Sequence, residues 1–600
     1  MQEKLKDKLP IFVRERDLCK LASGLMLAIC LIGCAAGPQV QPGSGASERD
    51  PEARATEAAE PLASAPDDAI ADLDADLLFH VLAAERLAAV GDFEAAIEHF
   101  LEAARLGDDP DLARQVVSLA LSLQDWSALV DGAVRWQELA PAERAPARFL
   151  ALGLLNLDEI ESAADVLAEQ IELAGDERAA WREAVMLLAA AATERNAEQA
   201  MSALMHRAGL DPNSGEALRH QSLLEWQLGR SEAAMSLAAA AAEAADDVEA
   251  WLWAAQLASA ADDLEQALDN YRRARALEPE NQALALSEAE TLRQLDQLDD
   301  AIAVLAGLPP GSELLYLLGS YQFQAGELED AAVTWHRLAA LDAVDDPMHH
   351  AFLTGFLAEL LDMNDEALDW YQRIDSGSQL DRARLRRAVL ESQRGELDLA
   401  RELLQAVRLT GNRELVEQAW LIEGDILREA GRASEAVDLL SGALRQNPDS
   451  IALLYTRAIC AIAIDDLELA EQDFRRILQI EDDNAMALNA LGYTLTDRTD
   501  RHEEAYRLIR RALELEPDSP AIQDSMGWVY FRLGQPEKAL PYLEQALQGE
   551  DNPEIAAHLG EVLWYLGRED DARKVLFGAF ERFPDDDYLG DTMGRLGLIE

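Results

Sequence analysis

One alanine recurs through the second half of the chain at intervals of about 33 to 36 residues. Each copy follows acidic or polar residues, and an apolar residue stands four positions later. The copies are Ala400, Ala436, Ala470, Ala505, Ala539 and Ala572. A fixed period of this length indicates a repeat array, in which each unit buries its apolar face only against its neighbours. A non-repetitive helical bundle would not keep the alanine in phase over so many units. The first half shows the same element less regularly, at Ala96, Ala163, Ala200, Ala234, Ala267, Ala301, Ala331 and Ala367.

The residues around each alanine predict a pair of antiparallel helices. A small residue in the first helix, such as Gly492 or Gly527, lets the second helix pack closely. Gly-containing turns separate the two helices, and a proline ends the second because it cannot continue one. The turn pairs are Gly91-Asp92, Gly431-Arg432 and Gly534-Gln535. One complete unit reads Trp420, Gly424, Leu427, Ala436, Leu440, Ala443 and Pro448. This pattern resembles the tetratricopeptide repeat, which implies an all-α superhelical solenoid of about fourteen helix pairs.

Composition and charge narrow the fold and the partners further. Ala, Leu, Glu, Gln and Arg favour helix, and no stretch alternates polar and apolar residues with the period of a strand. The formal net charge is −61. Nucleic-acid binding is therefore excluded as an expectation, since the phosphate backbone needs Lys and Arg to replace its counterions. An acidic surface keeps a protein in solution and attracts basic partners.

The N-terminus reads as an export signal. A net basic start precedes the apolar stretch from Leu21 to Ile32, which is too short to span a bilayer. The following Leu31-Ile32-Gly33-Cys34-Ala35 resembles the lipobox of bacterial lipoproteins, which implies cleavage before Cys34 and acylation of that cysteine. By the same resemblance, Ala35 in place of Asp implies the outer membrane, facing the periplasm. The alternatives are an ordinary signal peptide and a chance match to the lipobox.

Four segments follow from these features. Residues 1–33 are the predicted lipoprotein signal peptide, and 34–70 comprise the lipidated Cys34 and a flexible linker rich in Pro, Ala and acids. Residues 71–310 are predicted to form a degenerate N-terminal repeat array and 311–600 a C-terminal one. The boundary lies at Leu308-Pro309-Pro310-Gly311, where two prolines interrupt the pattern.

No residue pattern in the chain indicates catalysis, a cofactor or a metal. There is no glycine-rich phosphate loop, no paired Cys-x-x-Cys and no Gly-x-Ser-x-Gly elbow. The adjacent His349 and His350 would point about 100° apart on a helix, so they chelate a metal poorly together. Cys460 lies between apolar residues and is predicted to be a small buried residue.

Aromatic residues are the candidate binding residues. In tetratricopeptide proteins certain positions of each first helix face a concave groove, and that resemblance assigns to the groove Phe356, Tyr455, Tyr493, Trp528, Phe531 and Trp564. Large aromatic side chains in an acidic groove are suited to anchoring a protein partner. The alternative is packing between neighbouring units, which aromatic residues at helical spacing also serve.

A more specific resemblance is carried by the last four units. They contain residues 490–495 (ALGYTL), 497–499 (DRT), 524–530 (DSMGWVY) and 557–564 (AHLGEVLW). These segments are similar to the C-terminal part of proteobacterial tetratricopeptide outer-membrane lipoproteins. The type example is the adaptor that holds a periplasmic carboxyl-terminal processing protease together with its substrates, which are peptidoglycan hydrolases.

Three functions remain open on the sequence. The first is a non-enzymatic adaptor for such a protease. The second is a scaffold lipoprotein for envelope assembly or secretion, acting on a pilus, on polysaccharide or on outer-membrane proteins. The third is an enzyme whose site has no recognisable motif.

Overall fold

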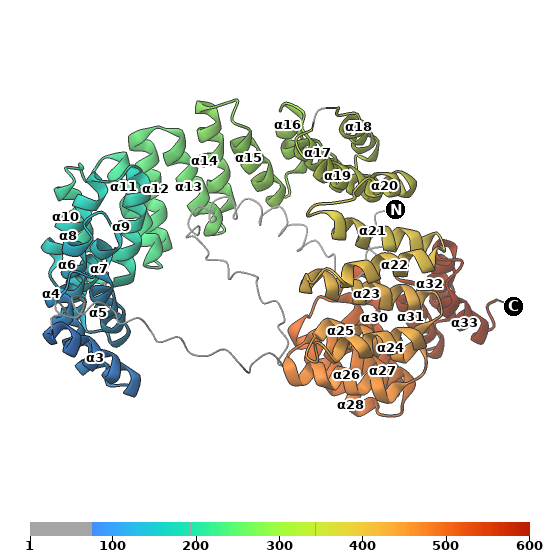
Figure 1. The fold of residues 1–600 in the computed structure, drawn as a ribbon. Coiled ribbons are helices and arrows are strands. Elements are labelled where there is room, and N and C mark those ends of the chain that lie inside the picture. Colours follow the sequence, from blue (N-terminus) through green and yellow to red (C-terminus); the bar gives the residue numbers. More distant parts are fainter. Residues whose placement is uncertain (1–74, 192–193, 343, 600) are drawn as a thin grey trace, which may run out of the picture. The chain divides into compact units, whose positions relative to one another are not determined.

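The computed structural model describes residues 75–191, 194–342 and 344–599. Within these ranges the regular elements are 31 α-helices, α3 to α33, and there is no strand. Successive helices run in antiparallel pairs along the chain (Figure 1). The all-α tetratricopeptide-repeat fold predicted from the alanine period is therefore confirmed.

The described residues fall into two compact units, which divide between Pro309 and Pro310. The N-terminal unit contains fourteen helices. They are α3 (Ala75–Val90), α4 (Phe93–Leu106), α5 (Pro110–Leu123), α6 (Trp126–Leu139), α7 (Ala145–Asn156), α8 (Ile160–Glu172), α9 (Glu177–Ala191), α10 (Glu194–Arg207), α11 (Gly215–Gln227), α12 (Ser231–Ala245), α13 (Val248–Ala260), α14 (Leu264–Leu277), α15 (Gln282–Gln294) and α16 (Leu298–Ala306).

The C-terminal unit contains the other seventeen described helices, which are eight successive pairs followed by α33. They are α17 (Ser312–Gln324), α18 (Leu328–Ala339), α19 (Pro347–Leu360), α20 (Asn364–Tyr371), α21 (Leu380–Gln393), α22 (Leu397–Arg408), α23 (Arg413–Glu429), α24 (Ala433–Leu444), α25 (Ile451–Ala463), α26 (Leu467–Ile480), α27 (Ala485–Arg498), α28 (His502–Leu515), α29 (Pro520–Arg532), α30 (Pro536–Gly549), α31 (Pro553–Tyr565), α32 (Glu569–Arg582) and α33 (Asp587–Arg595).

Turn chemistry and small residues produce this pairing. Gly91, Gly431 and Gly534 adopt φ of +85°, +72° and +74°, a left-handed conformation that glycine reaches without a Cβ penalty. The alanines of the repeating ladder, from Ala400 to Ala572, are fully buried. A Cβ added to Gly527 would lie 2.5 Å from Leu543 of the paired helix, so only glycine permits this approach. These observations confirm the roles predicted for the turn glycines, the ladder alanines and Gly527.

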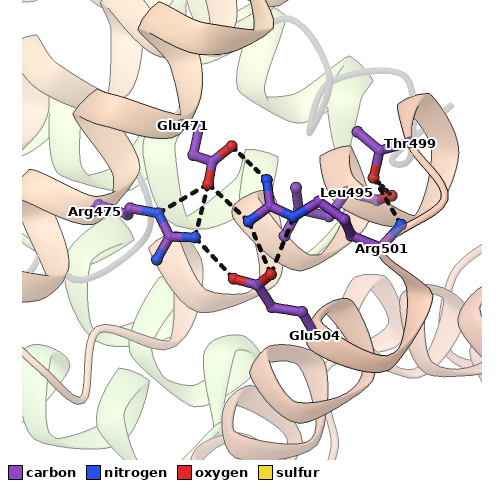
Figure 2. Close-up of polar contacts among 6 residues, drawn as sticks. All are labelled: Glu471, Arg475, Leu495, Thr499, Arg501 and Glu504. Atoms are coloured by element: carbon purple, nitrogen blue, oxygen red, sulfur yellow. Dashed lines mark hydrogen bonds and ion pairs between the residues drawn. The ribbon is translucent and has the colours of Figure 1, made fainter.

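Charged side chains join successive repeats on the outside of the C-terminal unit. Figure 2 shows Glu471 and Arg475 of α26 facing Arg501 and Glu504 at the start of α28. Arg501 bonds Glu471 at 2.7 Å, and Arg475 bonds Glu504 at 2.8 Å. The hydroxyl of Thr499 accepts from the backbone N–H of Arg501 and holds the turn that presents this side chain. The four charged groups alternate in sign, which stabilises the contact between the two second helices.

Several predictions concern the chain before residue 75. The signal peptide at 1–33, the lipidated Cys34 and the linker at 34–70 lie outside the described residues. Among the helices that are described, none is long and apolar enough to cross a membrane. Cys460 is buried, as predicted, and burial raises the pKa of its thiol to about 11.

Candidate protein-binding site

First helices of consecutive repeats pack side by side at the end of the C-terminal unit. Helices α27, α29, α31 and α33 contact one another in that order. Each is one helix pair further along the chain, so residues about 34 positions apart meet across the contacts. These four helices carry a cluster of aromatic side chains, which we call the aromatic cluster: Tyr493, Trp528, Phe531, His558, Tyr565 and Tyr588.

His558 is the centre of the aromatic cluster and is fully buried. Its Nδ1 lies 2.9 Å and 3.0 Å from the two carboxylate oxygens of Asp524, and its Nε2 lies 3.0 Å from the hydroxyl of Tyr588. Asp524 belongs to α29, His558 to α31 and Tyr588 to α33. One imidazole ring therefore links three consecutive first helices by hydrogen bonds.

Trp528 packs flat against this histidine. The two rings are 4.1 Å apart between centroids and inclined by 17°, and only 4% of Trp528 is exposed. This packing matches the alternative given for the aromatic residues, which is packing between neighbouring units, because the imidazole of His558 from the next repeat covers the indole. Its indole Nε1 is buried without a hydrogen-bond partner among the described residues. Trp528 is therefore a buried packing residue of the aromatic cluster.

The rim of the cluster is formed by Phe531 and Tyr565. Phe531 is half-buried and lies 5.5 Å from Tyr565 in an edge-to-face arrangement, while 70% of Tyr565 is exposed. Phe531 also contacts Trp528, with ring centroids 5.3 Å apart. An exposed tyrosine is thus supported by a continuous stack of rings that ends at His558, and such rigid aromatic groups are suited to anchoring another protein.

Tyr493 closes the other side of the cluster. Its hydroxyl donates a hydrogen bond to Glu554, which joins α27 to α31 across α29. Burial raises the pKa of Tyr493, and the Glu554 carboxylate raises it further. The phenol therefore stays protonated and remains a donor to this carboxylate at neutral pH.

Carboxylates set the electrostatics around His558. Burial by itself lowers the pKa of His558, but the Asp524 carboxylate, followed by Glu554 and Asp497, outweighs burial and the net pKa is raised. Burial likewise raises the pKa of Tyr588, and Asp497 and Glu554 add to this shift. The centre of the cluster is a negative environment that favours a positive imidazole.

Of the remaining predicted groove residues, Phe356 lies on α19 and Tyr455 on α25, whereas Trp564 lies on α31 next to Tyr565. Phe356 stacks on Tyr316 at 6.1 Å. Tyr455 packs edge-on against the buried Phe474 at 5.6 Å. Trp564 is half-buried beneath the guanidinium of Arg573, which is 5.1 Å from its ring. The structure thus brings together Tyr493, Trp528 and Phe531 of the predicted set, whereas Phe356, Tyr455 and Trp564 contact other neighbours.

The histidines 349 and 350 are engaged by protein groups. Nδ1 of His350 lies 2.9 Å from the Ser312 hydroxyl, and Nδ1 of His349 lies 3.2 Å from the Gln379 amide. In the part of the chain that the structure describes, no three His, Cys, Asp or Glu side chains gather as metal ligands do.

Five residues of this site were not predicted as functional: Asp524, Glu554, His558, Tyr565 and Tyr588. The sequence does hold one signal, because Asp524 and His558 are 34 residues apart, which is one repeat period. Residues at that separation occupy related positions in consecutive first helices. An acid and a histidine at this spacing are therefore candidates for a hydrogen bond between repeats.

Comparisons with known proteins agree with the fold. Family models described as "Tetratricopeptide repeat" match residues 427–492 and 530–596, 483–549, and 385–451. These matches extend over the aromatic cluster. They indicate a fold that is typically a non-catalytic scaffold for protein interactions.

Relatives with known sequences extend the similarity beyond these segments. The chain is 31% identical over 491 residues to "TPR repeat-containing protein PA4667" of Pseudomonas aeruginosa, covering 81% of this chain and 82% of that protein. It is 26% identical over 139 residues to "Type IV pilus assembly protein PilF" of the same organism, covering 23% of this chain and 55% of that one. Among solved structures, TTC0263 of Thermus thermophilus is 28% identical, with a TM-score of 0.28 over 30% of this chain and all of that chain. On the length and identity of the first match, this chain belongs to the tetratricopeptide-repeat protein family that includes PA4667.

Proposed function

We propose that this protein is a non-enzymatic scaffold that binds other proteins through the face formed by α27, α29 and α31. The observation that carries this proposal is the exposed Tyr565, which stands edge-on against Phe531 above the buried Trp528 and His558. A partner that covers Tyr565 gains the burial of a large ring that is already held in place, so it loses little side-chain entropy.

The proposal is tested by affinity capture from envelope extracts with the wild-type protein and Tyr565→Ala. Loss of an anchoring aromatic side chain costs about 2 kcal/mol, which corresponds to a roughly thirtyfold loss of affinity. Val333→Ala is the matched control, because Val333 is an exposed apolar residue on the second helix α18. Equal capture by the wild type and both variants would contradict the assignment of this face, and capture of no protein by the wild type would contradict the scaffold itself.

The tether is the second part of the proposal. A lipid on Cys34 would hold the repeat array at the outer membrane on its periplasmic side, and the support for this is the apolar run followed by Leu31 to Ala35. Cys34→Ala is expected to abolish acylation and to leave the chain unprocessed. If the variant still fractionates with the outer membrane as the mature protein, the tether is wrong.

Two classes of partner are distinguished by the same capture. The resemblance of the last four repeats supports an adaptor for a periplasmic carboxyl-terminal processing protease and its peptidoglycan hydrolase substrates. The partial similarity to a type IV pilus assembly protein supports a scaffold for envelope assembly. Mass spectrometry of the captured proteins separates the two, because the first predicts a protease and hydrolases and the second predicts components of an envelope assembly.

A further inference from the structure

Helix α3 carries a stripe of exposed side chains along its length. Phe79, Leu82, Arg86 and Val90 are spaced by three or four residues, so they lie on one face of the helix. The three apolar members are 60%, 55% and 62% exposed, and Arg86 is exposed as well. The opposite side of α3 packs on α4 and contains the fully buried Ala84. We call Phe79, Leu82, Arg86 and Val90 the α3 stripe.

The corresponding positions of other first helices are buried. Phe79 and Arg86 stand 17 and 10 residues before Ala96, the ladder alanine of their repeat. In four other repeats the residues at these two distances before the ladder alanine are at most 3% exposed: Ala250 and Leu257 of α13, Leu453 and Cys460 of α25, Ile522 and Val529 of α29, and Ile555 and Val562 of α31. In each case the preceding second helix, α12, α24, α28 or α30, packs on that first helix. The α3 stripe is therefore a helix-packing surface that no described helix covers.

Two histidines hold the ring of Phe79 in place. The ring stands edge-on to His80 at 5.3 Å and to His99 of α4 at 5.8 Å between centroids. The Nδ1 atoms of the two histidines are 2.9 Å apart, so the histidines are joined to each other as well. A partner that covers this exposed ring loses little side-chain entropy, because the ring is already ordered.

Arg86 determines which kind of helix fits the α3 stripe. Its guanidinium makes no hydrogen bond or ion pair with the residues that the structure describes. The residues at the corresponding position of α13, α25, α29 and α31 are uncharged. A helix docked on the stripe would bury the charge of Arg86, which is costly unless a carboxylate pairs with it. The complementary surface is therefore an apolar stripe that includes one Asp or Glu.

The chain itself and a second copy of it both fit this chemistry poorly. The large apolar residues of 41–74 are Leu62, Ile70 and Leu73 alone, so this segment lacks the apolar stripe of a second helix. A second copy would pair its own α3 stripe with this one. Either symmetric arrangement of the two helices brings the two Arg86 side chains within about one turn of each other, and neither stripe contains a carboxylate to compensate them.

We propose that the α3 stripe is a second docking surface of this protein, and that its partner is an amphipathic α-helix of another protein whose apolar stripe includes one acidic residue. Phe79, Leu82 and Val90 supply the apolar contacts, and the acidic residue pairs with Arg86. This surface belongs to the N-terminal unit and uses no residue of the aromatic cluster, so the two surfaces are tested separately.

Photo-crosslinking of the full chain in the cell tests this surface, with a photoreactive phenylalanine derivative in place of Phe79. Mass spectrometry of the digested adduct identifies the cross-linked segment. We expect a segment of another protein with apolar residues every three or four positions and an Asp or Glu among them. Arg86→Glu should lower the adduct yield at least about tenfold, because two carboxylates then face each other. Arg182→Glu is the matched control, since Arg182 is an exposed arginine of α9 in the same unit, and it should leave the yield unchanged.

Arg86→Lys separates the loss of the charge from the loss of the arginine side chain. Lysine keeps the positive charge, so most of the adduct should be retained. The proposal is overturned by an adduct between two copies, with residues 41–74 of the same chain or with lipid alone. It is also overturned if no adduct forms, or if Arg86→Glu leaves the yield unchanged. None of these outcomes concerns Tyr565, so the function proposed for the aromatic cluster stands or fails independently.

Discussion

A buried histidine stacks on a tryptophan in both units, and the two sites respond to protons in opposite ways. In the N-terminal unit His220 lies 4.4 Å from Trp181 at an angle of 13°, and in the C-terminal unit His558 lies 4.1 Å from Trp528 at 17°. Burial lowers the pKa of His220 to about 4, whereas the pKa of His558 is raised. The ring stacking is nearly the same at the two sites, so stacking does not determine whether the pKa of the histidine is raised or lowered.

The difference lies in the carboxylate partners. His558 is bonded to Asp524 at 2.9 Å, but the carboxylate of Glu216 lies 3.9 Å from His220, beyond hydrogen-bond distance. Nε2 of His220 is buried and has no hydrogen-bond partner among the described residues. Burial without a bonded carboxylate favours the neutral imidazole, whereas a bonded carboxylate favours the positive one. His220 is therefore part of an apolar core, whereas His558 connects neighbouring helices by hydrogen bonds.

The largest expected effect comes from replacing each histidine by leucine. His558→Leu removes the partner of the buried Asp524 and is expected to cost about 3–5 kcal/mol, since one member of a buried pair is left uncompensated. His220→Leu is expected to change stability by less than about 1.5 kcal/mol, because it exchanges a neutral buried ring for an apolar side chain. Urea unfolding followed by hydrogen exchange in each unit measures both. Similar losses of stability at the two sites would contradict the proposed difference between His220 and His558.

The second effect is a pH dependence of opposite sign in the two units. The folded pKa of His220 is depressed, so its contribution is fully present above about pH 6.5 and is lost as pH falls toward 4. Over that interval α9 and α11 are expected to lose about 3 kcal/mol of protection, at about 1.4 kcal/mol per pKa unit. Hydrogen exchange of these helices between pH 4 and pH 7 is the measurement, with His220→Gln as the variant that should abolish the loss. Protection of α9 and α11 that increases on acidification would contradict the assigned neutral state.

The smallest effect concerns the exposed ion pairs between α26 and α28, which contrast with the buried pair of Asp524 and His558. A double-mutant cycle of Arg501→Ala and Glu471→Ala is expected to give a coupling of less than about 1 kcal/mol that decreases in high salt, because solvent screens both side chains. The hydrogen bond from Arg501 lowers the pKa of Glu471 to about 2. This contribution is therefore present above the ordinary pKa of a glutamate and is lost only as pH falls toward 2. A coupling that is large and independent of salt would show that exposed and buried pairs do not differ here.

Much of the fold could be predicted from the sequence because the spacing of the repeating alanine follows from the packing of successive helix pairs. Ala436 and Ala539 are buried where the ladder places them, and Gly527 lies against Leu543 as a close helix approach requires. The cluster was only partly predictable. Repeat position alone places Trp528 on the first-helix face, but it does not show that His558 from the following repeat covers the indole.

The hydrogen bonds of His558 to Asp524 and Tyr588 could not be predicted for a similar reason. Asp524 and His558 are one period apart, which makes their contact conceivable, whereas Tyr588 comes 30 residues after His558 on the terminal helix α33. Its hydroxyl reaches Nε2 because of how α33 docks on α31, and that docking depends on apolar contacts formed by several helices. The spacing of residues along the sequence does not show which helices form such apolar contacts.

Site-specific photo-crosslinking in the cell is the most direct test of the scaffold account. A photoreactive amino acid is placed at Tyr565 on the rim of the aromatic cluster and, as the control, at the exposed Val333 on α18. Discrete adducts with other proteins are expected from position 565, and none of those adducts is expected from position 333. If position 565 yields no protein adduct, or if both positions yield the same ones, the claim that this face binds a protein partner is contradicted.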